Sequence, residues 1–161
     1  MPTATIRNAT PADVDRIAEI ATLAWQPVFD EFHRAAGDEN YDIMFPLGNK
    51  RKDPELRRIC AECPDNVIVT EVDGVVAGFA TYFVVGEKFG EVGNNAVHPD
   101  YQGQGIGSGH MEEIFRRLKE AGCKLVKVFT GMDPAHAPAR AMYEKAGFRK
   151  WWQAVTYIRE L

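Results

Sequence analysis

The chain has 161 residues and a formal net charge of −4; hydrophobic residues make up 45% of it and charged residues 26%. These proportions are ordinary for one folded domain with a hydrophobic core, and they exclude an intrinsically disordered chain. No long basic run appears, which argues against a nucleic-acid partner. The start lacks a secretory pattern, and no apolar run approaches the roughly 20 residues of a membrane helix. We therefore expect a single cytoplasmic domain over 1–161, without a membrane partner.

Three cysteines, Cys60, Cys63 and Cys123, are too few and of the wrong parity for a disulfide framework. Cys60 and Cys63 have the spacing of half a zinc site. A zinc site needs further ligands at matching spacing, and no second pair follows in the sequence. We therefore predict no metal.

The first part of the chain predicts a strand, a helix and an irregular region. Residues 5–7 are typical of a strand. Thr10, Pro11 and Asp13 then combine a hydroxyl cap, a proline in the first turn and an acid, which is a helix start. Apolar residues at helical spacing carry this helix to about Trp25. Residues 26–65 are the least regular, and we expect one or two short helices there, the later one around 54–61.

The rest of the chain alternates strands and helices. Asp73-Gly74 stands between two β-branched runs, and because both residues tolerate positive φ, it predicts a hairpin. The predicted strands are 67–72, 75–85, 89–97 and 125–130. One helix is predicted from about 107 to a stop at Gly122, and another over 138–146. Two final strands are predicted at 148–152 and 155–160. This order predicts a mixed α/β sheet with helices on both faces.

A glycine-rich loop joins the strand 89–97 to the next helix. Gly103, Gly105 and Gly107 let the main chain approach a ligand, and a helix N-terminus attracts anions, so the loop predicts a phosphate site. A dinucleotide fingerprint would need glycine at position 108 or 110, where Ser108 and His110 stand. A Walker loop is excluded too, because the sequence contains no Gly-Lys-Ser/Thr.

Another pattern fits this loop. Gln102-x-x-Gly105-x-Gly107 matches the (Gln/Arg)-x-x-Gly-x-(Gly/Ala) signature of the GNAT superfamily of acyl-CoA N-acyltransferases. Residues 139–148 resemble the C-terminal helix of that family, which often reads Ala-x-x-x-Tyr-Glu-Lys-x-Gly-Phe, and residues 72–79 resemble its central hairpin. The resemblance covers nearly the whole chain and is weakest over 26–65.

The resemblance implies the GNAT fold, with a mostly antiparallel central sheet of six to seven strands and helices on both faces. It also implies an N-acetyltransferase in which a primary amine attacks the thioester of acetyl-CoA directly. The pantetheine arm should pair with the main chain of 95–97, and an amide near Val97 should polarise the thioester oxygen. The residues that the resemblance assigns to the cofactor are Asn95, Ala96, Val97, Gln102, Gly103, Gln104, Gly105, Ile106, Gly107, Ser108, His136 and Tyr143.

Three side chains are candidates for catalytic work. Tyr143 matches the family tyrosine that protonates the departing thiolate. Glu91 matches a glutamate base of some members; the strand period places it on the face of Asn95 and Val97, and a solvated glutamate is the other interpretation. His136 stands where the family commonly has asparagine, so it contacts the cofactor arm, serves as a base or caps a helix.

The sequence leaves the acceptor open. Between Asp30 and Asp42 five acids face one arginine, so the stretch 29–45 forms either a wall that attracts a cationic amine or a solvated helix. A homodimer also stays open, with Trp151 or Trp152 as a contact. Two other functions compete: a CoA-binding regulatory module without turnover, against which Tyr143 weighs, and a mononucleotide-binding module that uses the same loop.

Overall fold

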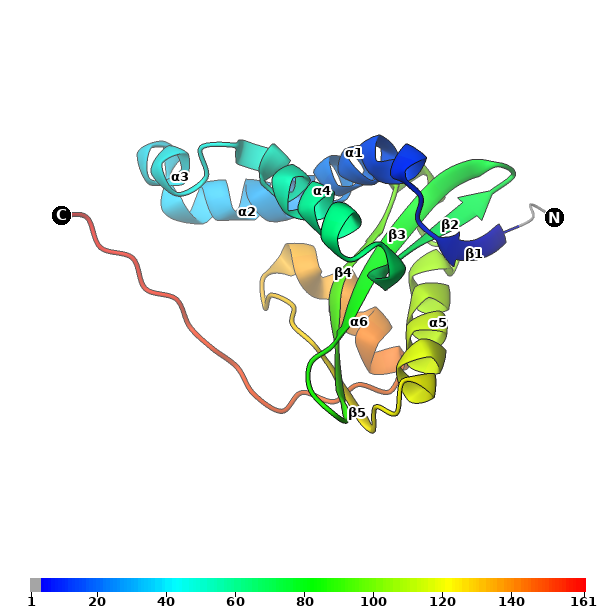
Figure 1. Ribbon diagram of the computed structural model, residues 1–161. Coiled ribbons are helices and arrows are strands. Elements are labelled where there is room, and N and C mark those ends of the chain that lie inside the picture. The colour runs from blue at the N-terminus through cyan, green and yellow to red at the C-terminus, as the bar shows by residue number, and fades with distance from the viewer. Residues whose placement is uncertain (1–3) are drawn as a thin grey trace.

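The computed structural model describes residues 4–161. Its centre is a five-stranded sheet of order β1-β2-β3-β4-β5 (Figure 1). The strands are β1 (Ala4–Asn8), β2 (Val67–Val72), β3 (Val75–Val84), β4 (Phe89–Val97) and β5 (Leu125–Val128). Neighbours among the first four strands are antiparallel, and β5 pairs with β4 in parallel. The predicted mixed, mostly antiparallel sheet is confirmed, although it has five strands and not six or seven.

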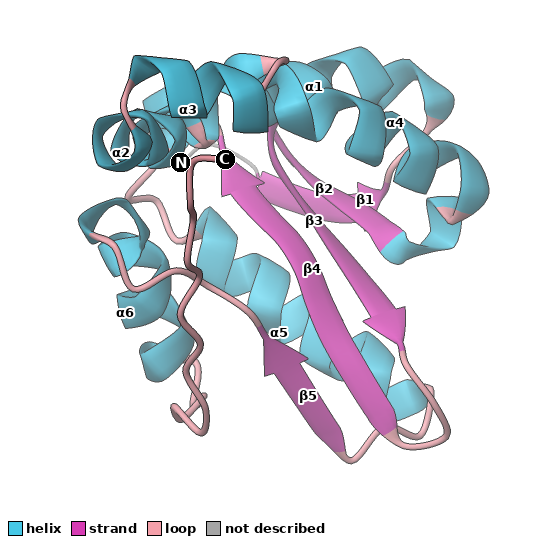
Figure 2. Ribbon diagram, turned by 90° about the vertical axis from the view of Figure 1, so that its left-hand side faces the viewer, coloured by secondary structure: helices cyan, strands magenta, loops and turns pink. Residues whose placement is uncertain are grey.

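Helices cover both faces of this sheet (Figure 2). They are α1 (Val14–Ala24), α2 (Gln26–Ala36), α3 (Asp38–Met44), α4 (Lys52–Glu62), α5 (Ile106–Glu120) and α6 (Ala137–Lys145), with short 3₁₀ turns between them. α1 and α4 pack on one face through a buried cluster that includes Ile17, Leu56 and Phe79. α5 and α6 pack on the other face through a cluster that includes Met111 and Tyr143. We call these the α1/α4 face and the α5/α6 face.

The hairpin is confirmed in detail, and the region 26–65 contains more helix than expected. Asp73 and Gly74 have φ of 48° and 84°, the left-handed conformation that the turn requires. Three α-helices, not one or two, occupy residues 26–65. Phe29 of α2 packs edge-on against Phe45, which follows α3, so these two helices bury apolar rings against each other. Because that contact is between helices and not with the sheet, it leaves no long apolar period in the sequence.

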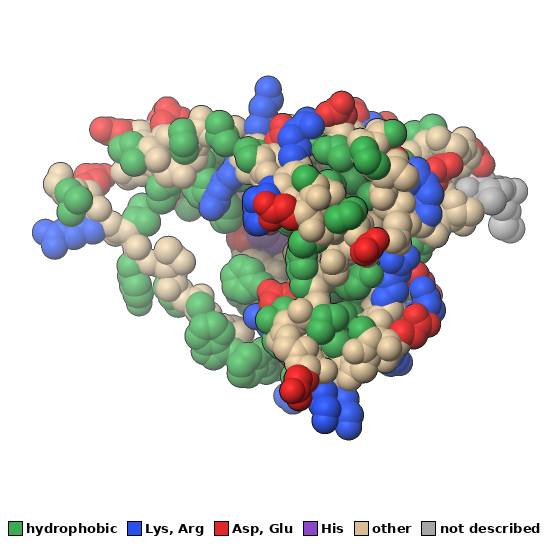
Figure 3. All heavy atoms as spheres, in the orientation of Figure 1, with side chains coloured by type: hydrophobic (Ala, Val, Ile, Leu, Met, Phe, Trp, Pro, Cys, Tyr) green, Lys and Arg blue, Asp and Glu red, His purple; other side chains and the backbone are tan. Residues whose placement is uncertain are grey.

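The two predicted C-terminal strands are wrong. Residues 146–161 form no helix or strand, and the segment 149–161, here called the C-terminal tail, is exposed along its whole length. Figure 3 shows it as a run of largely hydrophobic side chains that stands clear of the body. Its contacts are an ion pair of Lys150 with Glu144 at 3.2 Å and a hydrogen bond from Asn40 to Glu160 at 3.2 Å.

The composition of the tail explains this error. Residues 149–161 contain no glycine, proline, asparagine or aspartate, so nothing favours the turn that two consecutive strands would need. The adjacent edge strand, β5, ends at Val128 and not at 130. An apolar, β-branched stretch shows that a segment can form a strand, but not that an edge of the same chain receives it.

Candidate active site

The strands β4 and β5 separate near the middle of β4. Their pairing joins Phe89–Val92 to Leu125–Val128; β5 then ends, while β4 continues to Val97. On the other side of β4, the His98 amide donates to the Ala77 carbonyl at 2.8 Å. Because main-chain groups of successive residues in a strand point to alternate sides, the amides and carbonyls of Asn95 and Val97 point to the side that β5 has left. This edge can accept an extended ligand as an added strand.

The glycine loop continues directly from this edge. A 3₁₀ turn at Pro99–Tyr101 closes with the Tyr101 amide donating to the His98 carbonyl at 2.9 Å. The side-chain amide of Gln102 then reaches back and donates to the Val97 carbonyl at 3.2 Å. This contact holds the loop against the end of β4, so the edge and the loop form one continuous surface.

The N-terminus of α5 presents bare main-chain donors. Gly105, its cap residue, has φ of 82° and supplies no side-chain hydrogen bond to the first turn. A Cβ placed on Gly103 or Gly105 would meet nothing within 4 Å, so both residues border open space. Unpaired amides at the positive end of a helix dipole favour an anion. The geometry fits the predicted phosphate site.

Gly107 is needed for a different reason. A Cβ there would lie 3.0 Å from the Met142 sulfur and 3.6 Å from Nδ2 of Asn95. The distance to the sulfur is tighter than ordinary contact and the distance to Asn95 is ordinary contact, so Gly107 lets α5 approach α6 closely. The sequence pattern grouped it with Gly103 and Gly105, but only those two border open space.

Tyr143 is buried in the cluster on the α5/α6 face of the sheet. It belongs to the α5/α6 cluster with Val92, and Val128 packs against the same cluster; these two valines form the last rung of the β4–β5 pairing. Its ring lies edge-on to Phe148, with centroids 5.7 Å apart. Burial raises the pKa of Tyr143 to about 12, so the phenol stays protonated and able to donate.

Glu91 lies on the opposite face of β4 from the side chain of Asn95, so the predicted shared face is wrong. Ala80 of β3 is paired with Asn95, whereas Tyr82 is paired with Val92. Over this step β4 has one residue more than β3, which is a β-bulge. An extra residue reverses the side of the sheet to which all following side chains point. Glu91 therefore lies on the α1/α4 face.

The carboxylate of Glu91 has a basic partner. Lys127, its neighbour on β5, lies with Nζ 3.0 Å from a carboxylate oxygen. Phe83, its neighbour on β3, packs against the α1/α4 cluster. Glu91 thus belongs to the paired part of the two strands, and its role as a base stays a prediction.

His136 follows the end of the loop between β5 and α6. Its Nδ1 lies 2.6 Å from an oxygen of Asp133, and its amide donates to the other oxygen of that carboxylate at 3.2 Å. The turn Pro134–His136 packs against α2. The side chain of His136 is therefore held in the turn between α2 and α6. Its predicted contact with a cofactor stays a prediction.

The sequence reasoning missed a buried polar group next to this site. His110 of α5 is fully buried and lies within hydrogen-bonding distance of Asn95 and Thr70. The sequence offered one signal, a histidine directly beside Met111 on the apolar face of a helix. Such a residue must find polar partners inside the core.

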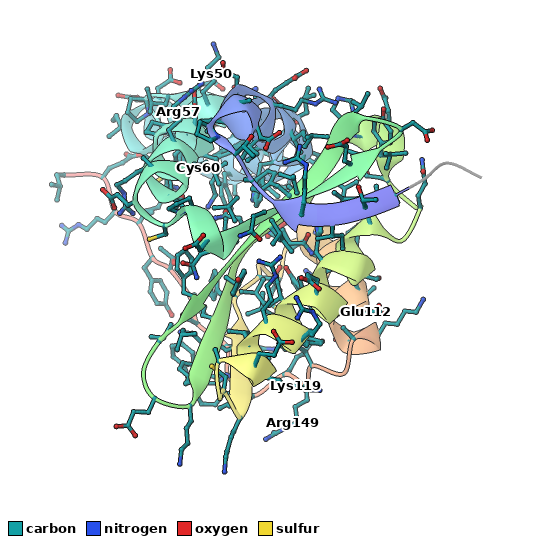
Figure 4. All side chains as sticks on the ribbon, turned by 45° about the vertical axis from the view of Figure 1, so that its right-hand side comes forward. Lys50, Arg57, Cys60, Glu112, Lys119 and Arg149 are labelled. Carbon is teal, nitrogen blue, oxygen red and sulfur yellow. The ribbon has the colours of Figure 1, made fainter. Side chains whose placement is uncertain are left out.

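Residues 4–161 contain neither a metal-binding cluster nor a membrane-spanning helix. No group of three or more histidine, cysteine or acidic side chains there is arranged to hold a metal ion, and Cys60, on α4 (Figure 4), and Cys63 are free thiols. Within the same residues, no helix combines the length and the apolar character needed to cross a membrane.

Comparison with known proteins agrees with this geometry. The acetyltransferase (GNAT) family model matches residues 17–148. An "Uncharacterized N-acetyltransferase" of Archaeoglobus fulgidus is 30% identical over 151 residues, covering 90% of this chain and 92% of its own. "Acetyltransferase SG1711" of Sodalis glossinidius is 29% identical over 107 residues, covering 66% and 72%.

A solved structure supports the same fold. The structure of a GNAT family acetyltransferase from Brucella melitensis in complex with acetyl-CoA superposes with a TM-score of 0.65 at 20% identity, covering 99% of this chain and 91% of that one. The separated strands, the bare helix start, the family model and these relatives all agree. The chain belongs to the acetyltransferase (GNAT) family.

Proposed function

We propose that the protein is an N-acetyltransferase that transfers the acetyl group of acetyl-CoA to a primary amine by direct attack. The observation that carries this proposal is the continuity of two binding surfaces, the open edge of β4 at Asn95 and Val97 and the bare first turn of α5. An extended arm ending in a diphosphate is the ligand shape that such a surface fits. Membership of the family supports acetyl-CoA as the donor.

Binding uses main-chain groups of the chain. The amide and carbonyl of Asn95 would pair with the pantetheine arm, and the amides of residues 102–108 would hold the diphosphate. Bound acetyl-CoA supplies an activated thioester. The Val97 amide, aimed at the open side of β4, stabilises negative charge that develops on an acyl oxygen.

Tyr143 would return a proton to the thiolate. A thiol like that of cysteine has a pKa near 8.5, whereas burial raises the pKa of Tyr143 to about 12. The phenol therefore still carries its proton when the thiolate leaves, although it is a weaker acid than the thiol it protonates. Its value as a donor rests on its position in the buried cluster that also contains Val92, the last residue of β4 that pairs with β5.

Glu91 is the candidate base. We expect Glu91→Gln to lower kcat about a hundredfold, because an amide cannot accept the proton that the amine loses. The measurement is initial velocity at saturating acetyl-CoA and amine. Lys127→Met is the control, since it breaks the same ion pair and keeps the carboxylate, and it should change kcat only a few-fold. Equal falls in the two variants would assign the pair to structure alone.

We further propose a cationic amine as the acceptor. α2 borders the turn that carries His136, α3 packs against α2, and the exposed surface of these two helices holds the acids Asp30, Glu39 and Asp42. Acids near an entrance raise the local concentration of cations. Acetylation rates for polyamines, aminoglycosides, amino acids and peptide N-termini test this choice, and an absence of preference for multiply charged amines would count against it.

Thermal-shift titration separates the acetyltransferase from its rivals. CoA should raise Tm with concentration, whereas ATP and NAD should not, because only a ligand of the native state stabilises it by mass action. A comparable shift with ATP would favour a mononucleotide module. A shift with CoA but no turnover with any amine would favour a regulatory module.

A further inference from the structure

The inner side of α5 holds a fully buried imidazole. His110 is 0% exposed and its partner Thr70 is 2% exposed, whereas Glu112 and Lys119 project from the outer side of the helix (Figure 4). The ring lies over Gly78 of β3, where a Cβ would come within 3.1 Å of His110 Cε1. A polar ring in such a place costs free energy unless both nitrogens have partners, so its hydrogen bonds are a structural requirement.

The hydrogen bonds of His110 form a chain in which each donor and each acceptor can be assigned. Oγ1 of Thr70 lies 2.8 Å from Nε2 of His110, and Nδ1 lies 2.8 Å from Oδ1 of Asn95. Nδ2 of Asn95 donates to the Gly107 carbonyl at 3.4 Å and approaches the Met142 sulfur at 3.5 Å. Since the carbonyl and the thioether can only accept, the amide nitrogen of Asn95 must face them and its oxygen must face His110.

The tautomer of His110 follows from this order. Nδ1 carries the proton and donates to Asn95, and Nε2 accepts from the Thr70 hydroxyl. Burial lowers the pKa of His110 to about 4, so the ring is neutral, with one donor and one acceptor, over the whole physiological range. The chain of bonds thus starts on β2, crosses β3 and ends on the first turn of α5.

We propose that His110 is a positioning residue for the cofactor. Through Asn95 it fixes the first turn of α5, which takes the diphosphate, relative to the edge of β4, which takes the pantetheine arm. This inference rests on the proposed function. Each half of the site can bind its own part of CoA without His110. The relative position of the two halves, however, depends on His110.

The energetic reason lies in linked binding. CoA joins a nucleotide half and a pantetheine half covalently, so its affinity exceeds that of either half only when both subsites can be engaged at once. If α5 shifts relative to β4, each half still binds, but the joined molecule loses the advantage. The affinity of CoA should therefore respond to His110, and the affinities of 3′-phospho-ADP and of pantetheine should not.

Two substitutions separate positioning from packing. The amide of asparagine reaches the place of imidazole Nδ1, so His110→Asn can keep the link to Asn95. The longer glutamine reaches the place of Nε2, so His110→Gln keeps Thr70 and loses Asn95. Glutamine fills more of the cavity, so a packing role predicts that His110→Gln is the milder change. The positioning role predicts the reverse order.

Calorimetry with CoA, 3′-phospho-ADP and pantetheine gives the readout and needs no acceptor amine. We expect His110→Gln to weaken CoA about tenfold and His110→Asn to weaken it less than about threefold, with the two fragments bound as in the unsubstituted protein. Ile114→Val, a buried change on the same helix outside the chain of bonds, should lower Tm and leave CoA affinity unchanged.

Asn95→Leu provides a second route if the His110 variants do not fold. Asn95 is only partly buried, and its loss breaks the last link while Thr70 and His110 remain paired. CoA should weaken about tenfold here too, again without change for 3′-phospho-ADP. Two results would overturn the inference. One is a CoA affinity that is higher in His110→Gln than in His110→Asn, and the other is a loss of affinity for the two fragments as large as that for CoA. An unsubstituted protein that does not bind CoA would overturn the proposed function itself.

Discussion

Gly105→Val is expected to weaken CoA binding about a hundredfold or more in a protein that still folds. The valine side chain would stand in the open space over the first turn of α5, where a Cβ on Gly105 meets nothing within 4 Å. Loss of two charge-assisted hydrogen bonds to a diphosphate, each worth about 1.5 kcal/mol, corresponds to that factor. Calorimetric titration with CoA measures it.

The control lies at the other end of the same helix. Gly122 has φ of 84°, close to the 82° of Gly105, and a Cβ there also meets nothing within 4 Å. Gly122→Val therefore imposes the same backbone strain, about 1–3 kcal/mol, without approaching the proposed diphosphate site. The Tm of both variants should fall by a similar amount, and only Gly105→Val should lose affinity for CoA. An equal loss of CoA affinity in both would mean that strain alone explains the effect.

Tyr143→Phe is expected to lower kcat by a factor of about 10²–10³ without changing the affinity for CoA. The change removes only the hydroxyl, and the ring still fills its place against Phe148. Because burial raises the pKa of Tyr143 to about 12, deprotonation of this group should not reduce the rate of the unsubstituted enzyme below that pH. Rates of thiol release at saturating amine, measured from neutral to alkaline pH, test both statements.

Tyr82→Phe is the matched control. Tyr82 belongs to the same buried cluster, but its hydroxyl is already engaged elsewhere: it donates to the Asp65 carbonyl at 3.1 Å and accepts from Arg117 at 3.3 Å. Its removal should lower stability by about 1 kcal/mol and leave kcat unchanged. A fall in kcat of the same size for both tyrosines would remove Tyr143 from the proposed chemistry.

Short-range signals in the sequence were sufficient for the central elements. Asp73-Gly74 specified the hairpin because positive φ at both residues is a local requirement, and the predicted helix start near 107 lies one residue from the observed start of α5 at Ile106. The cofactor edge at 95–97 followed from the resemblance, and its open side became visible only where β5 stops. The point at which two paired strands separate depends on both strands, so the sequence of either strand alone does not predict it.

The errors come from features that depend on distant parts of the chain. The bulge in β4 moved Glu91 to the other face. Gly93 lies within this bulge, and a glycine inside a strand often accompanies one, but the residue type alone does not show that the register shifts there. The ring contact between Phe29 and Phe45 joins α2 to the end of α3, and the spacing of apolar residues in the sequence did not show that these are two separate helices. His110 was treated as the residue that breaks a dinucleotide pattern, because its partners on β2 and β4 are distant in sequence.

The exposed tail also bears on the behaviour of the protein in solution. Residues 151–158 are rich in aromatic and β-branched side chains, carry no charge and contain no proline, the composition that favours self-association through extended backbone. Arg149, Lys150, Arg159 and Glu160 flank this stretch, and charges in such places oppose uncontrolled stacking of chains. We therefore expect these charges to limit association between tails, and the homodimer that the sequence leaves open stays a prediction.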